Sequence, residues 1–132
     1  TEEDFETRVK DITQGGGVDL VLDAVGKDTA EKGLACLGER GRLVSYGMSS
    51  GAIEPVDVNL LRSRSASVAT AGLMSYIKDS NEMRMRAASL FEMIGTGSLK
   101  VHINHSVAIE DVVEAHTKLE GRQTTGSTVF RF

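Results

Sequence analysis

The sequence has little that is typical of secreted, membrane or nucleic-acid-binding proteins. Cys36 is its single cysteine, so no disulfide can form within the chain. No apolar run approaches the roughly 20 residues of a membrane span, and no secretory signal opens the sequence. The formal net charge of -4 argues against a nucleic-acid partner, because such binding relies on a basic face. We therefore expect no nucleic-acid or membrane partner, and the missing disulfide framework fits a cytoplasmic location.

Recognisable metal-binding and catalytic patterns are also missing. His102 and His105 lie three positions apart, a spacing that puts them on opposite faces of a strand, and no Cys-x-x-Cys pair occurs, so we expect no metal site. The run Gly-Met-Ser-Ser-Gly at 47–51 misses the Gly-x-Ser-x-Gly pattern of a nucleophile by one residue, and a β-turn explains it equally well. We assign no catalytic residue. Cys36 and His116 lie in apolar helical stretches and are expected in the core.

What the sequence does contain is a repeated unit of a strand followed by glycine. Short runs rich in branched apolar side chains predict strands at 18–22, 43–46 and 67–71. The glycines that follow them are Gly26, Gly47 and Gly72. The first strand is almost continuously apolar, which is typical of a strand buried on both faces of a parallel sheet.

Amphipathic periodicity predicts helices between and after these strands. They are expected at 2–14, from Thr29 to Gly38, from Ser80 or Asn81 to 95, and at 109–119, with further strands at 101–107 and 128–130. This order predicts an α/β fold: the second half of a Rossmann-type parallel sheet with helices on both faces. No glycine-rich phosphate loop precedes the first strand, so we expect a fragment whose first half is missing.

Ligands of open parallel sheets bind beyond the carboxyl ends of the strands. This rule makes 23–26, 46–49 and 70–72 the candidate site, where glycine lets a planar ring or a ribose approach the backbone. The alternative is that Gly26 and Gly47 merely turn the chain. Asp23 likewise has two interpretations, a base or a residue that organises the turn after its strand.

Motifs along the whole chain resemble the C-terminal portion of the NADPH:quinone oxidoreductases. These enzymes form the zeta-crystallin-like, zinc-free branch of the medium-chain dehydrogenase/reductase superfamily. The matching segments are 23–29, 34–37, 41–51, 90–94, 97–101, 114–120 and 124–128.

The resemblance implies a fold and an activity. Residues 1–100 would form the C-terminal part of an NAD(P)-binding Rossmann domain, and residues 101–132 would return to a GroES-like catalytic domain whose N-terminal part is absent. The implied reaction is hydride transfer from NADPH to a quinone or a related electron-poor carbonyl or alkene. A homodimer would form through the edge strand at Ser67–Ala71.

The resemblance also implies which residues contact NADPH. The cofactor would lie against Ala24, Val25, Gly26, Tyr46, Gly47, Met48, Ser49, Thr70, Ala71 and Gly72, with Arg122 facing its phosphates. Two segments depart from the family pattern. Tyr-Gly-Met at 46–48 stands where relatives often carry Phe-Gly-Asn, and Thr-Ala-Gly at 70–72 stands where some carry Thr-Arg-Pro.

Two other functions remain open from the sequence. The chain could be a non-catalytic dimerisation or interaction domain derived from the same fold. It could also be half of a methyltransferase-type sheet that binds S-adenosylmethionine. Because the helix N-terminus that holds a pyrophosphate is absent, we expect the isolated 132 residues to bind NADPH weakly.

Overall fold

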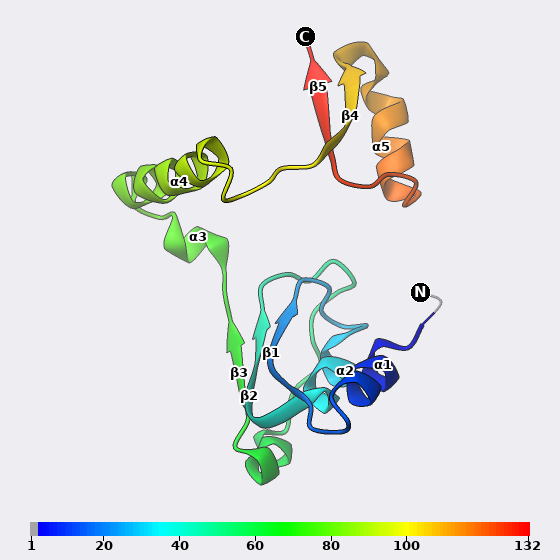
Figure 1. The fold of residues 1–132 in the computed structure, drawn as a ribbon, viewed down its shortest axis with the longest axis vertical. Coiled ribbons are helices and arrows are strands. Elements are labelled where there is room, and N and C mark those ends of the chain that lie inside the picture. The colour runs from blue at the N-terminus through cyan, green and yellow to red at the C-terminus, as the bar shows by residue number, and fades with distance from the viewer. Residues whose placement is uncertain (1–2) are drawn as a thin grey trace. The chain divides into compact units, whose positions relative to one another are not determined.

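A computed structural model describes residues 3–132, which form two compact units (Figure 1). The N-terminal unit extends to Lys78 and the C-terminal unit is Asp79–Phe132. The expected domain boundary at residue 100 stays a prediction. No helix in the described part of the chain is both long and apolar enough to cross a membrane.

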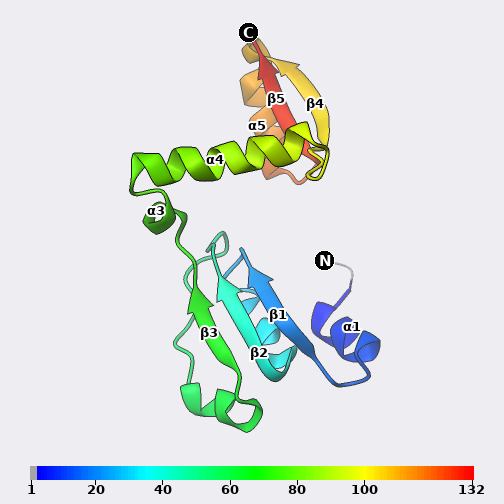
Figure 2. The ribbon, with the colours of Figure 1, turned by 60° about the vertical axis from the view of Figure 1, so that its left-hand side comes forward.

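The N-terminal unit is built on a three-stranded parallel sheet in the order β1-β2-β3 (Figure 2). Its strands are β1 (Val18–Asp23), β2 (Leu37–Ser45) and β3 (Ser67–Thr70). Helix α2 (Ala30–Ala35) connects β1 to β2, which confirms the predicted βαβ unit. Asp23 pairs in register with Ser45, and Ser45 with Thr70, so the carboxyl ends of all three strands lie level.

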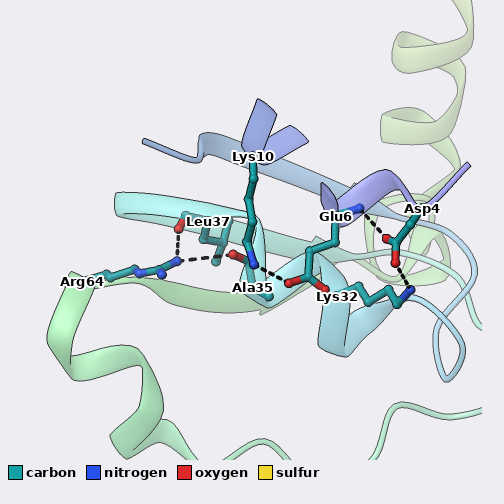
Figure 3. A network of polar contacts seen from close by, with 7 residues as sticks. All are labelled: Asp4, Glu6, Lys10, Lys32, Ala35, Leu37 and Arg64. Atoms are coloured by element: carbon teal, nitrogen blue, oxygen red, sulfur yellow. Dashed lines mark hydrogen bonds and ion pairs between the residues drawn. The ribbon is translucent and has the colours of Figure 1, made fainter. Parts of the chain in front are cut away.

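Helix α1 (Phe5–Ile12) precedes the sheet and is tied to α2. Its N-cap is Asp4, which accepts a hydrogen bond from the backbone N–H of Glu6 at 3.0 Å. The other carboxylate oxygen of Asp4 lies 2.8 Å from Nζ of Lys32 in α2 (Figure 3). Lys10 and Glu6 form a further pair one turn apart on α1.

The core of this unit lies between β2 and α2. Its buried side chains are Ala30, Cys36, Leu37 and Leu43. Burial of Cys36 is therefore confirmed. On the other face, Leu20 and Leu22 of β1 are 51% and 62% exposed. The prediction that this strand is buried on both faces is wrong for the described residues, because α2 covers only the face of Val21 and Leu43.

The predicted boundary between α2 and β2 is wrong. We expected a helix to Gly38, but α2 ends at Ala35 and Gly38 already belongs to β2. A Cβ at Gly38 would lie 2.6 Å from the carbonyl oxygen of Gly16, so this glycine serves a backbone contact rather than a helix end. The guanidinium of Arg64 donates to the carbonyl oxygens of Ala35 and Leu37 and holds the junction (Figure 3).

Two short helices complete the N-terminal unit. The first is the 3-10 helix η1 (Val58–Arg64), which lies between β2 and β3 in the chain. Helix α3 (Leu73–Tyr76) follows β3 directly and was not expected.

The C-terminal unit pairs two parallel strands, β4 (Ile103–Ala108) and β5 (Ser127–Arg131). Between them lie η2 (Ile109–Asp111) and α5 (Val112–Glu120), whose Ala115 is buried. The unit begins with α4 (Ser80–Gly95), which is capped by Asp79 and not by Ser80 or Asn81.

Two further expectations for this unit are wrong. The strand expected at 101–107 begins only at Ile103, and Val101 precedes it and is 50% exposed. His116 is exposed rather than buried, and its ring stacks on Phe130 with centroids 6.4 Å apart.

Candidate functional site

The segments that follow β1, β2 and β3 lie together at one edge of the sheet. The aligned strand ends bring together 24–26, 46–49 and 70–72. Hydrogen bonding continues beyond the strands, because Tyr46 N–H donates to Asp23 O and Ala71 N–H donates to Ser45 O, both at 2.9 Å. All predicted site residues except Arg122 therefore lie at this edge.

The first two segments are packed backbone against backbone. Ser50 N–H donates to Val25 O at 2.9 Å, and Lys27 N–H donates to Gly51 O at 3.1 Å. A Cβ at Gly26 would lie 2.4 Å from Gly51 O, and Gly26 has a φ of +93°. The fold itself therefore requires glycine at position 26.

Gly47 is required for the same reason. A Cβ there would lie 2.4 Å from Ala24 O. The contact between the two loops thus accounts for both glycines, which supports the alternative that they shape the chain.

Gly72 has a different environment. Its φ is −93°, which any residue adopts, and no described atom lies within 4 Å of a Cβ placed on it. Neither conformation nor packing within the described chain requires glycine here. The backbone of this residue is open to a planar group that approaches it.

Asp23 organises the turn after β1, as one of its two interpretations expected. Its Oδ1 accepts hydrogen bonds from Val25 N–H at 2.8 Å, Gly26 N–H at 3.1 Å and Thr29 Oγ1 at 2.8 Å. Burial raises the pKa of the Asp23 carboxyl, but these three hydrogen bonds outweigh it and hold the pKa below its ordinary value.

The same contacts explain two local features. Because the Thr29 hydroxyl is engaged by Asp23, it does not cap α2 as expected. The second oxygen of Asp23, Oδ2, is buried and has no hydrogen-bond partner among the described residues.

The site surface combines apolar side chains with open backbone. A hollow of about 320 Å³ lies beside β1, where Phe5 and Gly33 line it together with Ala24 and Val25, and it includes none of residues 46–49 or 70–72. Tyr46 and Met48 are 55% and 70% exposed at the neighbouring strand end. Such a surface suits a flat ring that is recognised through backbone groups.

The described residues offer no metal centre at this edge. No group of three or more His, Cys, Asp or Glu side chains in residues 3–132 could hold a metal ion. Burial raises the pKa of the Cys36 thiol, which disfavours the thiolate that a metal would need. A second hollow, of about 220 Å³, lies in the C-terminal unit beside His105 and Lys118 and contains none of the predicted site residues.

Arg122 belongs to the C-terminal unit. It lies in the turn after α5 with a φ of +54°, and its backbone N–H donates to Leu119 O at 3.0 Å. Its contact with the phosphates of a cofactor stays a prediction.

Comparison with known proteins identifies the family. The family model described as zinc-binding dehydrogenase matches residues 1–130. The chain belongs to this family. The membership argues against the methyltransferase-type interpretation. Although the family description names zinc, the described residues lack a zinc-ligand set, so we derive no step through a metal.

Two curated relatives of the chain are named as a quinone oxidoreductase and a 2-haloacrylate reductase. A quinone oxidoreductase of Pseudomonas aeruginosa is 38% identical over 130 residues, which cover 98% of this chain and 40% of that protein. A 2-haloacrylate reductase of Burkholderia sp is 35% identical over 129 residues, or 96% of this chain and 39% of that protein.

A solved structure agrees with these relatives. The Escherichia coli quinone oxidoreductase complexed with NADPH matches with a TM-score of 0.80 and 39% identity, over 98% of this chain and 40% of that one. The α/β fold class and the resemblance to the C-terminal portion of a quinone oxidoreductase are thereby confirmed. The chain spans about 40% of the length of the relatives it matches.

Sequence reasoning missed one contributor to the site. Ser50 makes side-chain hydrogen bonds to both Val25 and Asp28, yet it was interpreted only as part of a β-turn. The signal was the serine-glycine pair that follows the second strand, but its partners lie 22 and 25 positions earlier in the chain.

Proposed function

We propose that this chain is part of an NADPH-dependent oxidoreductase whose cofactor lies at the carboxyl ends of β1, β2 and β3. One observation carries the proposal: three segments distant in sequence meet at one sheet edge, beside the open backbone of Gly72. The relative that was solved with NADPH, at 39% identity, supports the choice of cofactor.

The chain's own residues would bind and orient the cofactor. Backbone N–H and C=O groups at 70–72 pair with the nicotinamide carboxamide, while Tyr46, Met48 and Ser49 flank the ring. Ala24, Val25 and Gly26 form the floor beside it, and Arg122 faces the phosphates with a fork of donors. NADPH, when bound, supplies the hydride. No described side chain is assigned as a proton donor.

The substrate is proposed to be a quinone or a related electron-poor carbonyl or alkene. Relatives named for a quinone and for 2-haloacrylate support this class, because both compounds have an alkene conjugated to an electron-withdrawing group. We further propose a zinc-free, cytoplasmic homodimer that joins copies of β3. Among the described residues β3 pairs with β2 alone, so its other edge is open, which supports this mode of pairing.

Gly72→Ala tests the proposed cofactor site in the complete protein that contains this chain. The added methyl group would occupy the space that the nicotinamide needs, so we expect the KM for NADPH to rise about tenfold or more. The unfolding midpoint should stay unchanged, because no described atom lies within 4 Å of the new Cβ. NADPH oxidation in the presence of 1,4-benzoquinone measures the effect.

Gly95→Ala is the matched control. It adds the same methyl group at the end of α4, again with no described atom within 4 Å, and should leave the KM unchanged. An unmodified protein that neither binds nor oxidises NADPH would overturn the proposed function. If that protein still dimerised, the alternative of a non-catalytic dimerisation domain would be supported.

A further inference from the structure

We infer that Ser50 is a positioning residue whose hydroxyl locks the two glycine-containing loops in the arrangement that receives the nicotinamide end of NADPH. The inference rests on the proposed function and assigns a role to a residue outside the predicted contact set. Ser50 belongs to the Gly-Met-Ser-Ser-Gly run, which forms a turn closed by the hydrogen bond from Gly51 N–H to Met48 O at 3.0 Å.

Ser50 joins the loop after β2 to the loop after β1 through three hydrogen bonds. Its Oγ donates to Val25 O at 2.8 Å and accepts from Asp28 N–H at 3.0 Å. Its backbone N–H donates to the same Val25 oxygen at 2.9 Å. One residue therefore fixes both the Val25 peptide and the segment that enters α2.

The packing around these bonds makes the hydroxyl important. The loops meet so closely that a Cβ would fit at neither Gly26 nor Gly47, so no side chain is interposed between their backbones. Among the described residues, Ser50 provides the side-chain hydrogen bonds that join segment 24–28 to segment 46–51.

Loss of the hydroxyl should act on binding more than on folding. Ser50→Ala removes the partner of Asp28 N–H and one of two donors to Val25 O. Both bonds are solvent-exposed, so water can replace them in the folded protein. Backbone hydrogen bonds still join the two loops, but the segment that enters α2 loses its link to residue 50 and gains freedom. That freedom must be lost again when NADPH binds, which weakens binding through conformational entropy.

The test measures NADPH affinity and steady-state kinetics in the complete protein. For Ser50→Ala we expect the Kd and KM for NADPH to rise about tenfold while kcat changes less than about twofold. Ser50→Thr keeps a hydroxyl and should restore the affinity. Ser50→Cys, whose thiol forms weaker hydrogen bonds, should give an intermediate value.

The control is Ser63→Ala. Ser63 is exposed in η1, and its side chain has no hydrogen bond within the described part of the chain. The NADPH affinity of the Ser63→Ala variant should therefore equal that of the unmodified protein. A purely structural role for Ser50 would lower the unfolding midpoint or the active fraction without changing the Kd. An unchanged Kd in Ser50→Ala, or no rescue by Ser50→Thr, would overturn the inference.

The two proposals fail differently. If the unmodified protein binds no NADPH, the proposed function falls and this inference falls with it. If the unmodified protein binds NADPH and Ser50→Ala binds it equally well, only the positioning role is wrong.

Discussion

At the scale of single residues, the carboxylate of Asp23 holds the turn on which the site is built. Asp23→Ala removes three hydrogen bonds from a buried charged acceptor. Hydrogen bonds to charged groups contribute about 1.5–3 kcal/mol each and are not additive, so we expect the free energy of unfolding to fall by about 2–4 kcal/mol. Urea denaturation measures the change. Asp23→Asn, which keeps one acceptor oxygen, should lose less.

The pH dependence of this loss has a definite sign. Because the pKa of Asp23 is lowered in the folded protein, its carboxylate stabilises the fold fully above the ordinary pKa of an aspartate. That stabilisation is lost as the pH falls through the lowered value. The difference in unfolding free energy between the unmodified protein and Asp23→Ala should therefore shrink when urea denaturation is repeated below about pH 3. An equal difference at neutral and acid pH would contradict the assignment.

At the scale of elements, Arg64 connects η1 to the junction of α2 and β2. Its guanidinium donates to the last carbonyl of α2, on Ala35, and to Leu37 O. Arg64→Ala should lower the free energy of unfolding by about 1–2 kcal/mol, because a charged donor to two carbonyl oxygens is lost. Thermal and urea unfolding measure the loss.

Arg62→Ala is the control for this element. Arg62 lies in the same helix, is exposed, and its side chain has no hydrogen bond or ion pair among the described residues. Equal losses in the two variants would show that the charge of η1, and not the contacts of Arg64, stabilises the junction.

The elements also show what the sequence could predict. The strands and the βαβ unit were predictable because branched apolar runs and helical periodicity are local signals. The start of β2 could not be predicted in this way, because it depends on a backbone contact between Gly38 and Gly16. The exposure of Leu20 and Leu22 could not be predicted either, because an apolar run does not say which other elements cover each of its faces.

The site divides in the same way. The meeting of the segments after β1, β2 and β3 followed from the rule that parallel strands share a carboxyl edge. The distinct roles of the glycines could not be predicted from that rule, because they depend on which backbone atoms lie next to each glycine. Gly26 and Gly47 are closed in by neighbouring loops, whereas Gly72 is open.

At the scale of the whole molecule, we expect copies of the chain to pair through β3. This strand ends the sheet, with β2 on one side, and Val68 is 38% exposed. Val68→Lys would bring two charges together across a two-fold axis, so it should shift the complete protein from dimer to monomer. Sedimentation at several protein concentrations measures the shift, and Ser63→Lys, on exposed η1, should leave it unchanged. Dimers that persist in Val68→Lys would contradict pairing at this edge.

The most direct test of the central claim is the crystal structure of the complete protein with bound NADPH. The account predicts that the nicotinamide carboxamide lies within about 3.5 Å of backbone N–H or C=O groups at 70–72, with the ring beside Tyr46–Ser49. A nicotinamide bound away from the ends of β1, β2 and β3 would contradict it.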